Sequence, residues 1–229
     1  STEIKMKLDF SDKKILVTGG TKGIGLAISE ILHELGGDVI ALNSKDCDFE
    51  KDDIKKFLES DNDFSDIDIL INNAGINEID YFENIEDDDF EKIMKVNVNA
   101  PMIISKHVIG NMIKNNWGRI INISSVWGTK SIEKRTSYTT SKHAIKGLTK
   151  TMAIEFADKN ILVNSVSPGF TNTELTSKIL SEEQKQVLIE KVPMKRMAEP
   201  PEIARLVAFL CSDFNTYITG QDIAVDGGF

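Results

Sequence analysis

A tyrosine and a lysine with a spacing suited to proton transfer stand in the second half of the chain. Tyr138 and Lys142 are separated by three residues in a stretch with helical periodicity, so their side chains share one face of a helix. A free tyrosine titrates near pH ~10 and is a weak acid or base at neutral pH. A lysine ammonium one turn away favours the phenolate and brings the tyrosine toward its working range. The pair therefore predicts acid–base chemistry.

Ser125 distinguishes this pair from one that arises by chance. With 3 tyrosines and 27 lysines and arginines in 229 residues, the spacing alone has little weight. Ser125, however, directly follows an apolar stretch that reads as a buried strand, residues 119–123. Its hydroxyl is placed to hydrogen-bond the carbonyl oxygen that Tyr138 protonates, which is a small oxyanion-type contact. The three residues together predict proton transfer to a carbonyl group.

A glycine-rich turn predicts a nucleotide site near the start of the chain. Apolar residues 15–17 lead into the run Thr18-Gly19-Gly20-Thr21-Lys22-Gly23-Ile24-Gly25, and a helical pattern follows it. Glycines in such a turn allow a sharp bend, a close approach to a pyrophosphate and tight helix–strand packing. The helix N-terminus directs free N–H groups at the phosphates. The motif alone is a weak signal, because an ordinary strand-to-helix loop has the same composition.

Strands and helices alternate along the whole sequence, which predicts a doubly wound α/β fold. We expect a parallel sheet in a Rossmann-like three-layer sandwich, with one domain spanning residues 1–229. The expected strands are 15–17, 39–42, 67–71, 119–123, 162–166 and 222–225, and the longer expected helices are 86–114, 137–156 and 201–210. A full crossover helix does not fit between the second strand and a strand near Cys47-Asp48-Phe49, so one connection is expected to be a trimmed loop.

Four strand ends carry small or polar residues. Ligands in open α/β sheets bind beyond the carboxyl ends of the strands. The ends in question are the glycine turn, Asn72-Asn73-Ala74-Gly75, Ser124-Ser125 and Ser167-Pro168-Gly169. Their agreement predicts a bound cofactor along this edge more strongly than any single motif does.

Composition excludes several classes of function. The net charge of −9 disfavours nucleic acids and anionic membranes as partners. No apolar stretch is long enough to span a bilayer, and no signal-peptide core is present, so a cytoplasmic location is expected. Cys47 and Cys211 are expected to be buried small hydrophobes. Neither they nor His33, His107 and His143 have a spacing suited to a metal, so no metal site is predicted.

Taken together, these motifs resemble the short-chain dehydrogenase/reductase family. The resemblance extends through Pro168-Gly169 to the final Val225-Asp226-Gly227-Gly228 and so covers essentially the whole chain. It is most similar to the β-ketoacyl-ACP reductase type, because of the segments 123–126 and 217–228. It implies hydride transfer between a nicotinamide cofactor and a carbonyl or secondary alcohol. It also implies a homotetramer in which helices 89–114 and 137–156 form one interface and the last strand another.

The resemblance also implies roles for particular residues. Tyr138 is the acid/base, Lys142 sets its pKa and binds the cofactor ribose, and Ser125 donates a hydrogen bond to the substrate. Asn97 holds a water in the proton relay; from its residues alone, this position predicts only an irregularity in a helix. The expected cofactor-binding residues are Gly19, Thr21, Lys22, Gly23, Ile24, Gly25, Asn43, Ser44, Asp48, Asn73, Ala74, Gly75, Tyr138, Lys142, Pro168, Gly169 and Thr171.

Two departures from the family bear on the ligands. Asn43 stands where NAD-preferring relatives carry an acid, and Lys22 and Lys45 are near enough in sequence to bind a 2′-phosphate. This favours NADP(H), with NAD(H) as the alternative, although Ser44 replaces the arginine of many NADP enzymes.

The second departure concerns the substrate. A 3-oxoacyl thioester is the first expectation, and a small polar ketone is the alternative because of the charged run Glu133-Lys134-Arg135. The resemblance implies that basic residues at two positions dock the acyl carrier protein, and these positions are Asn116 and Lys159 here. The net charge of −9 and the lack of a basic residue at 116 disfavour an acidic carrier protein as partner. A non-catalytic nucleotide-binding scaffold is the remaining alternative.

Overall fold

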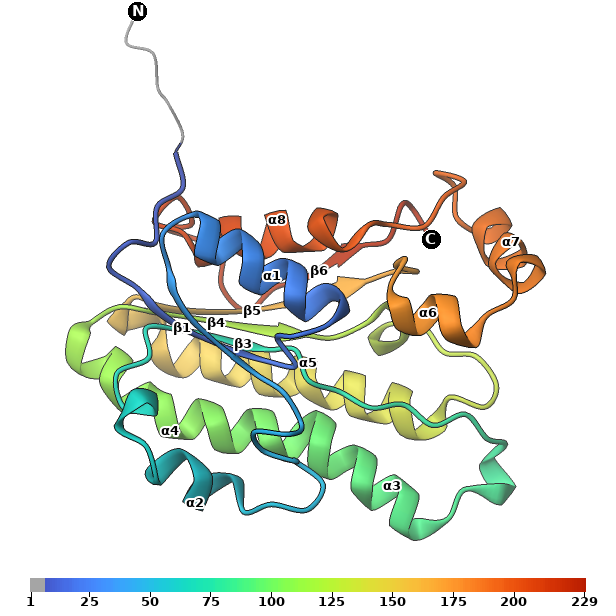
Figure 1. Ribbon diagram of the computed structural model, residues 1–229, viewed down its shortest axis with the longest axis horizontal. Coiled ribbons are helices and arrows are strands. Elements are labelled where there is room, and N and C mark those ends of the chain that lie inside the picture. Colours follow the sequence, from blue (N-terminus) through green and yellow to red (C-terminus); the bar gives the residue numbers. More distant parts are fainter. Residues whose placement is uncertain (1–6) are drawn as a thin grey trace, which may run out of the picture.

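The computed structural model describes residues 7–229, and its strands form one parallel sheet (Figure 1). Within these residues the sheet has six strands in the order β2-β1-β3-β4-β5-β6. The strands are β1 (Lys14–Thr18), β2 (Asp38–Leu42), β3 (Ile69–Asn72), β4 (Gly118–Ile123), β5 (Ile161–Pro168) and β6 (Asp222–Val225). The order reverses direction between β1 and β3, which is the switch point where ligands bind in such folds. The doubly wound sheet predicted from the sequence is confirmed.

Helices cover both faces of the sheet. They are α1 (Gly23–Glu34), α2 (Ile54–Glu59), α3 (Asp87–Met94), α4 (Ala100–Asn115), α5 (Thr136–Phe156), α6 (Glu174–Ile179), α7 (Glu182–Lys191) and α8 (Pro200–Cys211). Figure 1 shows α1 and α8 above the sheet and α4 and α5 below it, with α6 and α7 near the carboxyl ends of the strands. No helix within residues 7–229 combines the length and the apolar character of a membrane span.

The sheet separates two hydrophobic cores. In β1, Leu16 belongs to the core under α4 and α5, whereas Ile15 and Val17 belong to the core under α1 and α8. All three side chains are fully buried. A strand that is covered on both faces must be apolar at every position, which explains why this sequence has continuous apolar runs rather than alternation.

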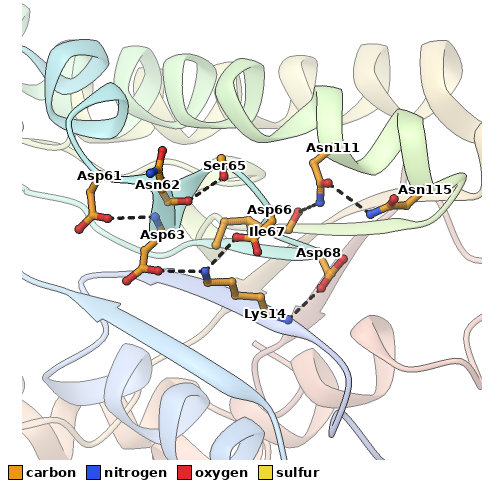
Figure 2. A network of polar contacts seen from close by, with 10 residues as sticks. All are labelled: Lys14, Asp61, Asn62, Asp63, Ser65, Asp66, Ile67, Asp68, Asn111 and Asn115. Atoms are coloured by element: carbon orange, nitrogen blue, oxygen red, sulfur yellow. Dashed lines mark hydrogen bonds and ion pairs between the residues drawn. The ribbon is translucent and has the colours of Figure 1, made fainter.

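A polar network lies at the edge of the sheet where the strands begin, opposite their carboxyl ends (Figure 2). The Nζ atom of Lys14 lies 2.9 Å from Asp66 and 3.2 Å from Asp63. The main-chain N–H of Lys14 donates to the carboxylate of Asp68 at 2.9 Å. Burial raises the pKa of Asp68, opposed by this hydrogen bond. The network joins the start of β1 to the loop before β3 and lies far from the carboxyl ends.

Two connections differ from the sequence prediction. The expected helix 86–114 is divided into α3 and α4 by the π turn Lys95–Asn99. The expected strand near Cys47 is wrong: residues 43–53 form turns, and the six-residue α2 makes the crossover. The reason is that Cys47 and Phe49 are buried in the core as loop side chains, so apolar residues here do not require a strand.

Candidate active site

Three glycines of the glycine turn stand where the backbone disfavours or excludes a side chain. Gly19 and Gly23 have φ values of 62° and 53°, which favour glycine. A Cβ atom added to Gly25 would lie 2.1 Å from the carbonyl oxygen of Gly19 and 2.4 Å from Nδ2 of Asn73. Even alanine therefore collides at this position, and the backbone remains open to a ligand at the N-terminus of α1.

Thr18 and Asn73 fasten this turn to the end of β3. The Thr18 hydroxyl accepts hydrogen bonds from the N–H groups of Asn73 and Ala74, both at 3.1 Å. In return, Nδ2 of Asn73 donates to the carbonyl oxygens of Thr18 and Gly19, again at 3.1 Å. Two of the predicted strand ends thus form one rigid unit.

A cleft of about 460 Å³ opens beside this unit at the ends of β1, β2 and β3. Its lining includes these residues from the sequence prediction: Gly19, Thr21, Lys22, Asn43, Ser44, Asp48, Ala74 and Gly75. Gly23, Ile24 and Gly25 begin α1 next to it, whereas Pro168, Gly169 and Thr171 lie at the end of β5 and do not line it. The volume, the glycine-rich turn and the helix N-terminus fit the pyrophosphate and adenosine of a dinucleotide.

Sequence reasoning missed the apolar wall of the cleft. Leu42, Phe49, Ile76 and Val96 also line it, from the end of β2, the following loop, the loop after β3 and the π turn. No motif marks these positions. The only signal is the alternation of apolar and polar residues across 47–50, which in hindsight indicates a loop with one face turned inward.

Positively and negatively charged side chains both lie near Asn43, at the end of β2. Lys22 and Lys45 line the cleft, and neither forms an ion pair within residues 7–229. The N–H of Asn43 donates to Oδ2 of Asp46 at 2.9 Å, and Oδ1 of Asn43 accepts from the N–H of Lys45 at 2.8 Å. The end of β2 therefore has a carboxylate beside it, whereas the sequence predicted none there because Asn43 replaces the acid of NAD-preferring relatives.

Ser125, Tyr138 and Lys142 come together where β4 ends against α5. Ser125 starts the 3₁₀ turn Val126–Gly128, and its Oγ accepts from the N–H of Trp127 at 3.2 Å. Lys142 is 5% exposed, and its Nζ donates to the carbonyl oxygen of Ile123 at 2.9 Å. The same Nζ lies 5.4 Å from the ring centroid of Tyr138. The structure thus places the predicted reactive residues together.

Burial dominates the electrostatics of Tyr138 and Lys142. Burial raises the pKa of Tyr138, while a hydrogen bond with Ser125 and the charge of Arg135 oppose that rise. Burial lowers the pKa of Lys142 to about 8. Lys142 is desolvated and hydrogen-bonded to the main chain, and its effect on the pKa of Tyr138 stays a prediction. The charge of Arg135 also favours the phenolate, and sequence reasoning had assigned this residue only to the substrate loop.

Asn97 lies in the π turn beside Lys142. Its side-chain oxygen accepts from the N–H of Ile76 at 2.8 Å, and its Nδ2 donates to the carbonyl of Ile76 at 2.9 Å and to Oγ of Ser141 at 3.0 Å. A Cβ on Gly75 would lie 3.4 Å from Oδ1 of Asn97 and 3.6 Å from Nζ of Lys142. The predicted helix irregularity is confirmed. The water-holding role stays a prediction, and the donors of the amide are already engaged.

Two buried asparagines support the site from below. Nδ2 of Asn72 donates to Oδ1 of Asn122 at 2.8 Å and to Oγ of Ser105 at 3.2 Å. Nδ2 of Asn122 donates to Oγ1 of Thr149 at 2.8 Å. This chain joins β3, β4, α4 and α5 under the reactive residues. Sequence reasoning missed it, although an asparagine that ends an apolar strand is a usable signal, because a buried amide needs partners.

Both cysteines are free and buried, as predicted. Cys47 also lines the cofactor cleft, and burial raises the pKa of its thiol to about 11. Burial likewise raises the pKa of Cys211, which lies at the end of α8. Burial and the raised pKa of both thiols disfavour the thiolate, which is the nucleophilic form of cysteine.

Comparison with known proteins decides the family. A family model described as Enoyl-(Acyl carrier protein) reductase matches residues 47–229. The 3-oxoacyl-(acyl-carrier-protein) reductase FabG of Aquifex aeolicus is 38% identical, over 97% of this chain and 99% of that protein. The chain belongs to the short-chain dehydrogenase/reductase family.

Further members of the short-chain dehydrogenase/reductase family match over nearly their whole length. The FabG reductase of Haemophilus influenzae is 39% identical, over 94% of this chain and 97% of that protein. A structure from Beutenbergia cavernae, assigned as an NAD(P)-dependent gluconate 5-dehydrogenase with NADP bound at low occupancy, has a TM-score of 0.87 at 27% identity. The match covers 97% of this chain and 98% of the chain in that structure. This chain is an NAD(P)-dependent oxidoreductase.

Proposed function

We propose that this enzyme reduces the ketone of a 3-oxoacyl thioester with NADP(H). The observation that carries the proposal is that Ser125, Tyr138 and the buried Lys142 come together where β4 ends against α5, next to a cleft with the features of a dinucleotide site. Two hydroxyl groups at one point provide two donors for one carbonyl oxygen. FabG relatives that match nearly the whole chain support the same substrate class.

Each reactive residue has a separate task in this proposal. When bound, the nicotinamide cofactor would supply the hydride for the carbonyl carbon. Ser125 orients the carbonyl oxygen, and Tyr138 donates its hydroxyl proton to that oxygen, which yields a secondary alcohol. Lys142, held in place by the carbonyl of Ile123, binds the ribose and stabilises the phenolate that Tyr138 leaves behind. Asn97 completes the path by which Tyr138 regains a proton.

NADP(H) is the proposed cofactor because of the cations in the cleft. Lys22 and Lys45 both line it, and a 2′-phosphate would form charge-assisted hydrogen bonds with them. NAD(H) is the alternative, and Asp46 supports it. Its carboxylate accepts from the N–H of Asn43 at the end of β2, close to where family members that prefer NAD carry an acid.

Aromatic side chains at three strand ends favour an apolar substrate tail. Trp127, Phe170 and Phe229 follow β4, β5 and β6, and their ring centroids lie 5.0 to 6.2 Å apart. Trp127 lies within the turn Val126–Gly128 that Ser125 begins. Such a cluster presents apolar surface to an acyl chain.

A small polar ketone is the second candidate, and a different observation favours it. The guanidinium of Arg135 lies near enough to Tyr138 to lower the pKa of the phenol. It could therefore pair with an anionic substrate group beside the reacting carbon. Two structural neighbours assigned as gluconate dehydrogenases support this alternative.

We also propose a homotetramer. Apolar side chains are exposed on the helices that the family resemblance assigns to one interface: Met102 and Ile113 on α4, and Ile154 on α5, which is 81% exposed. Tyr217, near β6, is 97% exposed. Burial of these side chains between subunits would remove apolar surface from water. An acyl carrier protein is a weaker proposal, because its acidic surface would face a chain of net charge −9.

One substrate panel tests the function. Acetoacetyl-CoA and a polar ketone such as 5-ketogluconate are each assayed with NADPH and with NADH by loss of nicotinamide absorbance, with Tyr138→Phe as the control. Turnover of the thioester with NADPH is the expected result. Turnover of the polar ketone alone would favour the second candidate, and turnover of neither across a wider carbonyl panel would refute both.

A further inference from the structure

A second lysine of α5 lies behind the reactive residues. Lys146 stands one turn beyond Lys142, so both side chains point to the same side of the helix. Its Nζ lies 2.7 Å from Oδ2 of Asp222, the first residue of β6, and donates to Oγ1 of Thr129 at 2.5 Å. The Lys146 and Asp222 side chains are only 16% and 20% exposed. None of the roles assigned above uses this ion pair.

The carboxylate of Asp222 extends the contact to β5. Its Oδ1 accepts hydrogen bonds from Oγ of Ser165 at 2.8 Å and from Oγ of Ser167 at 2.7 Å. Ser167 immediately precedes Pro168 and Gly169, the predicted cofactor residues at the end of β5. One carboxylate therefore has three donors, from α5 and from two positions of β5.

The turn that carries Ser125 is seated on α5 between Lys142 and Lys146. Oγ of Ser124 donates to the carbonyl oxygen of Lys142 at 3.1 Å. A Cβ on Gly128 would lie 2.7 Å from Oγ of Ser124, 3.0 Å from the carbonyl oxygen of Lys142 and 3.0 Å from Cε of Lys146. The contact between turn and helix is thus close, and Lys146 fixes its far end through Thr129.

We propose that Lys146 and Asp222 are positioning residues for the reduction. They hold the Ser125 turn and the end of β5 in a fixed relation to Tyr138, which is on the same helix as Lys146. This inference rests on the proposed function, since it assumes that Ser125 and Tyr138 act on one carbonyl. A displacement of about 1 Å between reacting groups can lower a rate on the order of 100-fold, so the pair acts on catalysis without touching the substrate.

The shielding of the pair explains why it can set a geometry. Exposed ion pairs are weak because water screens the two charges and because long side chains lose conformational entropy when they are held together. Here both side chains are mostly shielded, and the extra donors to Asp222 fix the orientation of its carboxylate. Removal of one partner leaves the other charge poorly solvated and free to seek new contacts, which would shift the segments that it holds.

Steady-state kinetics of single and double variants test the proposal. Lys146→Met and Asp222→Asn are each expected to lower kcat about 10- to 100-fold at saturating substrate, with a small change in the KM for the cofactor. Lys146→Arg should restore a large part of kcat because it keeps the charge. The double variant should lose less than the two single losses combined, since one contact is lost in all three.

The amino-terminal edge offers a matched control. Lys14 has a similarly shielded side chain, 18% exposed, and pairs with Asp66 at 2.9 Å (Figure 2). Its partners are more exposed than Asp222, since the side chains of Asp63 and Asp66 are 70% and 61% exposed. Lys14→Met removes the ion pairs of a shielded lysine far from the carboxyl ends of the strands, so its kcat should equal that of the unmodified enzyme. An equal loss of kcat in Lys14→Met, or full kcat in folded Lys146→Met and Asp222→Asn, would overturn the proposal.

Hydrogen exchange separates this inference from the proposed function. If the unmodified enzyme reduces no carbonyl compound, the proposed function has failed and kinetics says nothing of the ion pair. Exchange of backbone amides in 124–130 and 165–170 should still be faster in Lys146→Met and Asp222→Asn than in Lys14→Met. Unchanged exchange in these segments would refute the positioning role by itself.

Discussion

Replacement of Lys142 by methionine is expected to stabilise the protein while it stops catalysis. Methionine has a similar length and no charge, so it removes the ammonium from a site that is 5% exposed. Burial lowers the pKa of Lys142 from 10.5 to about 8. At about 1.36 kcal/mol for each pKa unit, the lowered pKa means that the charged form of Lys142 destabilises the folded protein by roughly 3 kcal/mol at pH 7.

Loss of one hydrogen bond reduces that gain. Nζ of Lys142 donates to the carbonyl oxygen of Ile123 at 2.9 Å, and a hydrogen bond from a charged group contributes about 1.5–3 kcal/mol. The net stabilisation by Lys142→Met at pH 7 is therefore expected to be about 1 kcal/mol. Activity should fall to background, because the ammonium that binds ribose and stabilises the phenolate is gone. Stability and function are opposed at this residue.

The pH dependence gives the sharper test. The folded-state pKa of Lys142 is depressed, so the penalty is fully present below pH 8, shrinks between pH 8 and pH 10.5, and vanishes above that range. Urea unfolding of the unmodified enzyme and of Lys142→Met at pH 7 and pH 10 measures the difference. Lys150→Met, an exposed lysine on the same helix, is the control. An advantage of Lys142→Met that is as large at pH 10 as at pH 7 would refute the reasoning.

The remaining predictions concern the proton donor, the cofactor and the assembly. Tyr138→Phe should lower kcat 10²- to 10⁴-fold with nearly unchanged cofactor affinity, and retention of more than about a tenth of kcat would contradict its role as acid. Gly25→Ala should abolish nicotinamide binding in a fluorescence titration, since its Cβ would lie 2.1 Å from the carbonyl oxygen of Gly19; normal binding would contradict the proposed cradle. NADPH should bind more tightly than NADH, and Asn43→Asp should reverse the order; tighter NADH binding by the unmodified enzyme would exclude the preference. Light scattering should give a tetramer, whereas a mass near 25.5 kDa at micromolar concentration would exclude one.

Local chemistry made the fold and the strand ends predictable. Gly19, Asn73 and Ser125 each lie just after an apolar run, at the end of a strand. Glycine suits the positive φ at position 19, and the side chains of Asn73 and Ser125 form hydrogen bonds with the main chain. The strand 222–225 was predicted with the bounds that the structure has. Such features depend on a few consecutive residues and on the rule that ligands meet the carboxyl ends of parallel strands. The same reasoning brought Tyr138, Lys142 and Ser125 to one place.

What could not be predicted depends on where side chains meet across the fold. Arg135 lies close enough to Tyr138 for its charge to favour the phenolate, and Nζ of Lys142 is turned toward the carbonyl of Ile123. Asp46 reaches the end of β2 through a turn whose shape no spacing rule specifies. The partner of Lys146 is in β6, far along the chain. Each outcome is set by tertiary contacts, which a single sequence does not encode in a short pattern.

The π turn at Lys95–Asn99 separates the helical phase of α3 from that of α4. Its wider winding shifts the following residues relative to one continuous α-helix, so the inward faces of the two helices are set independently. The turn directs Val96 to the cofactor cleft and Asn97 to Ile76 and Ser141 at once. If the same five residues were wound as a regular α-helix, α3 would be rotated by roughly 100°, the angle of one residue, about its axis relative to α4. The solvent-facing acids at the start of α3 would then turn toward the protein, so the wider turn keeps the amphipathic patterns of α3 and α4 compatible in a single rod.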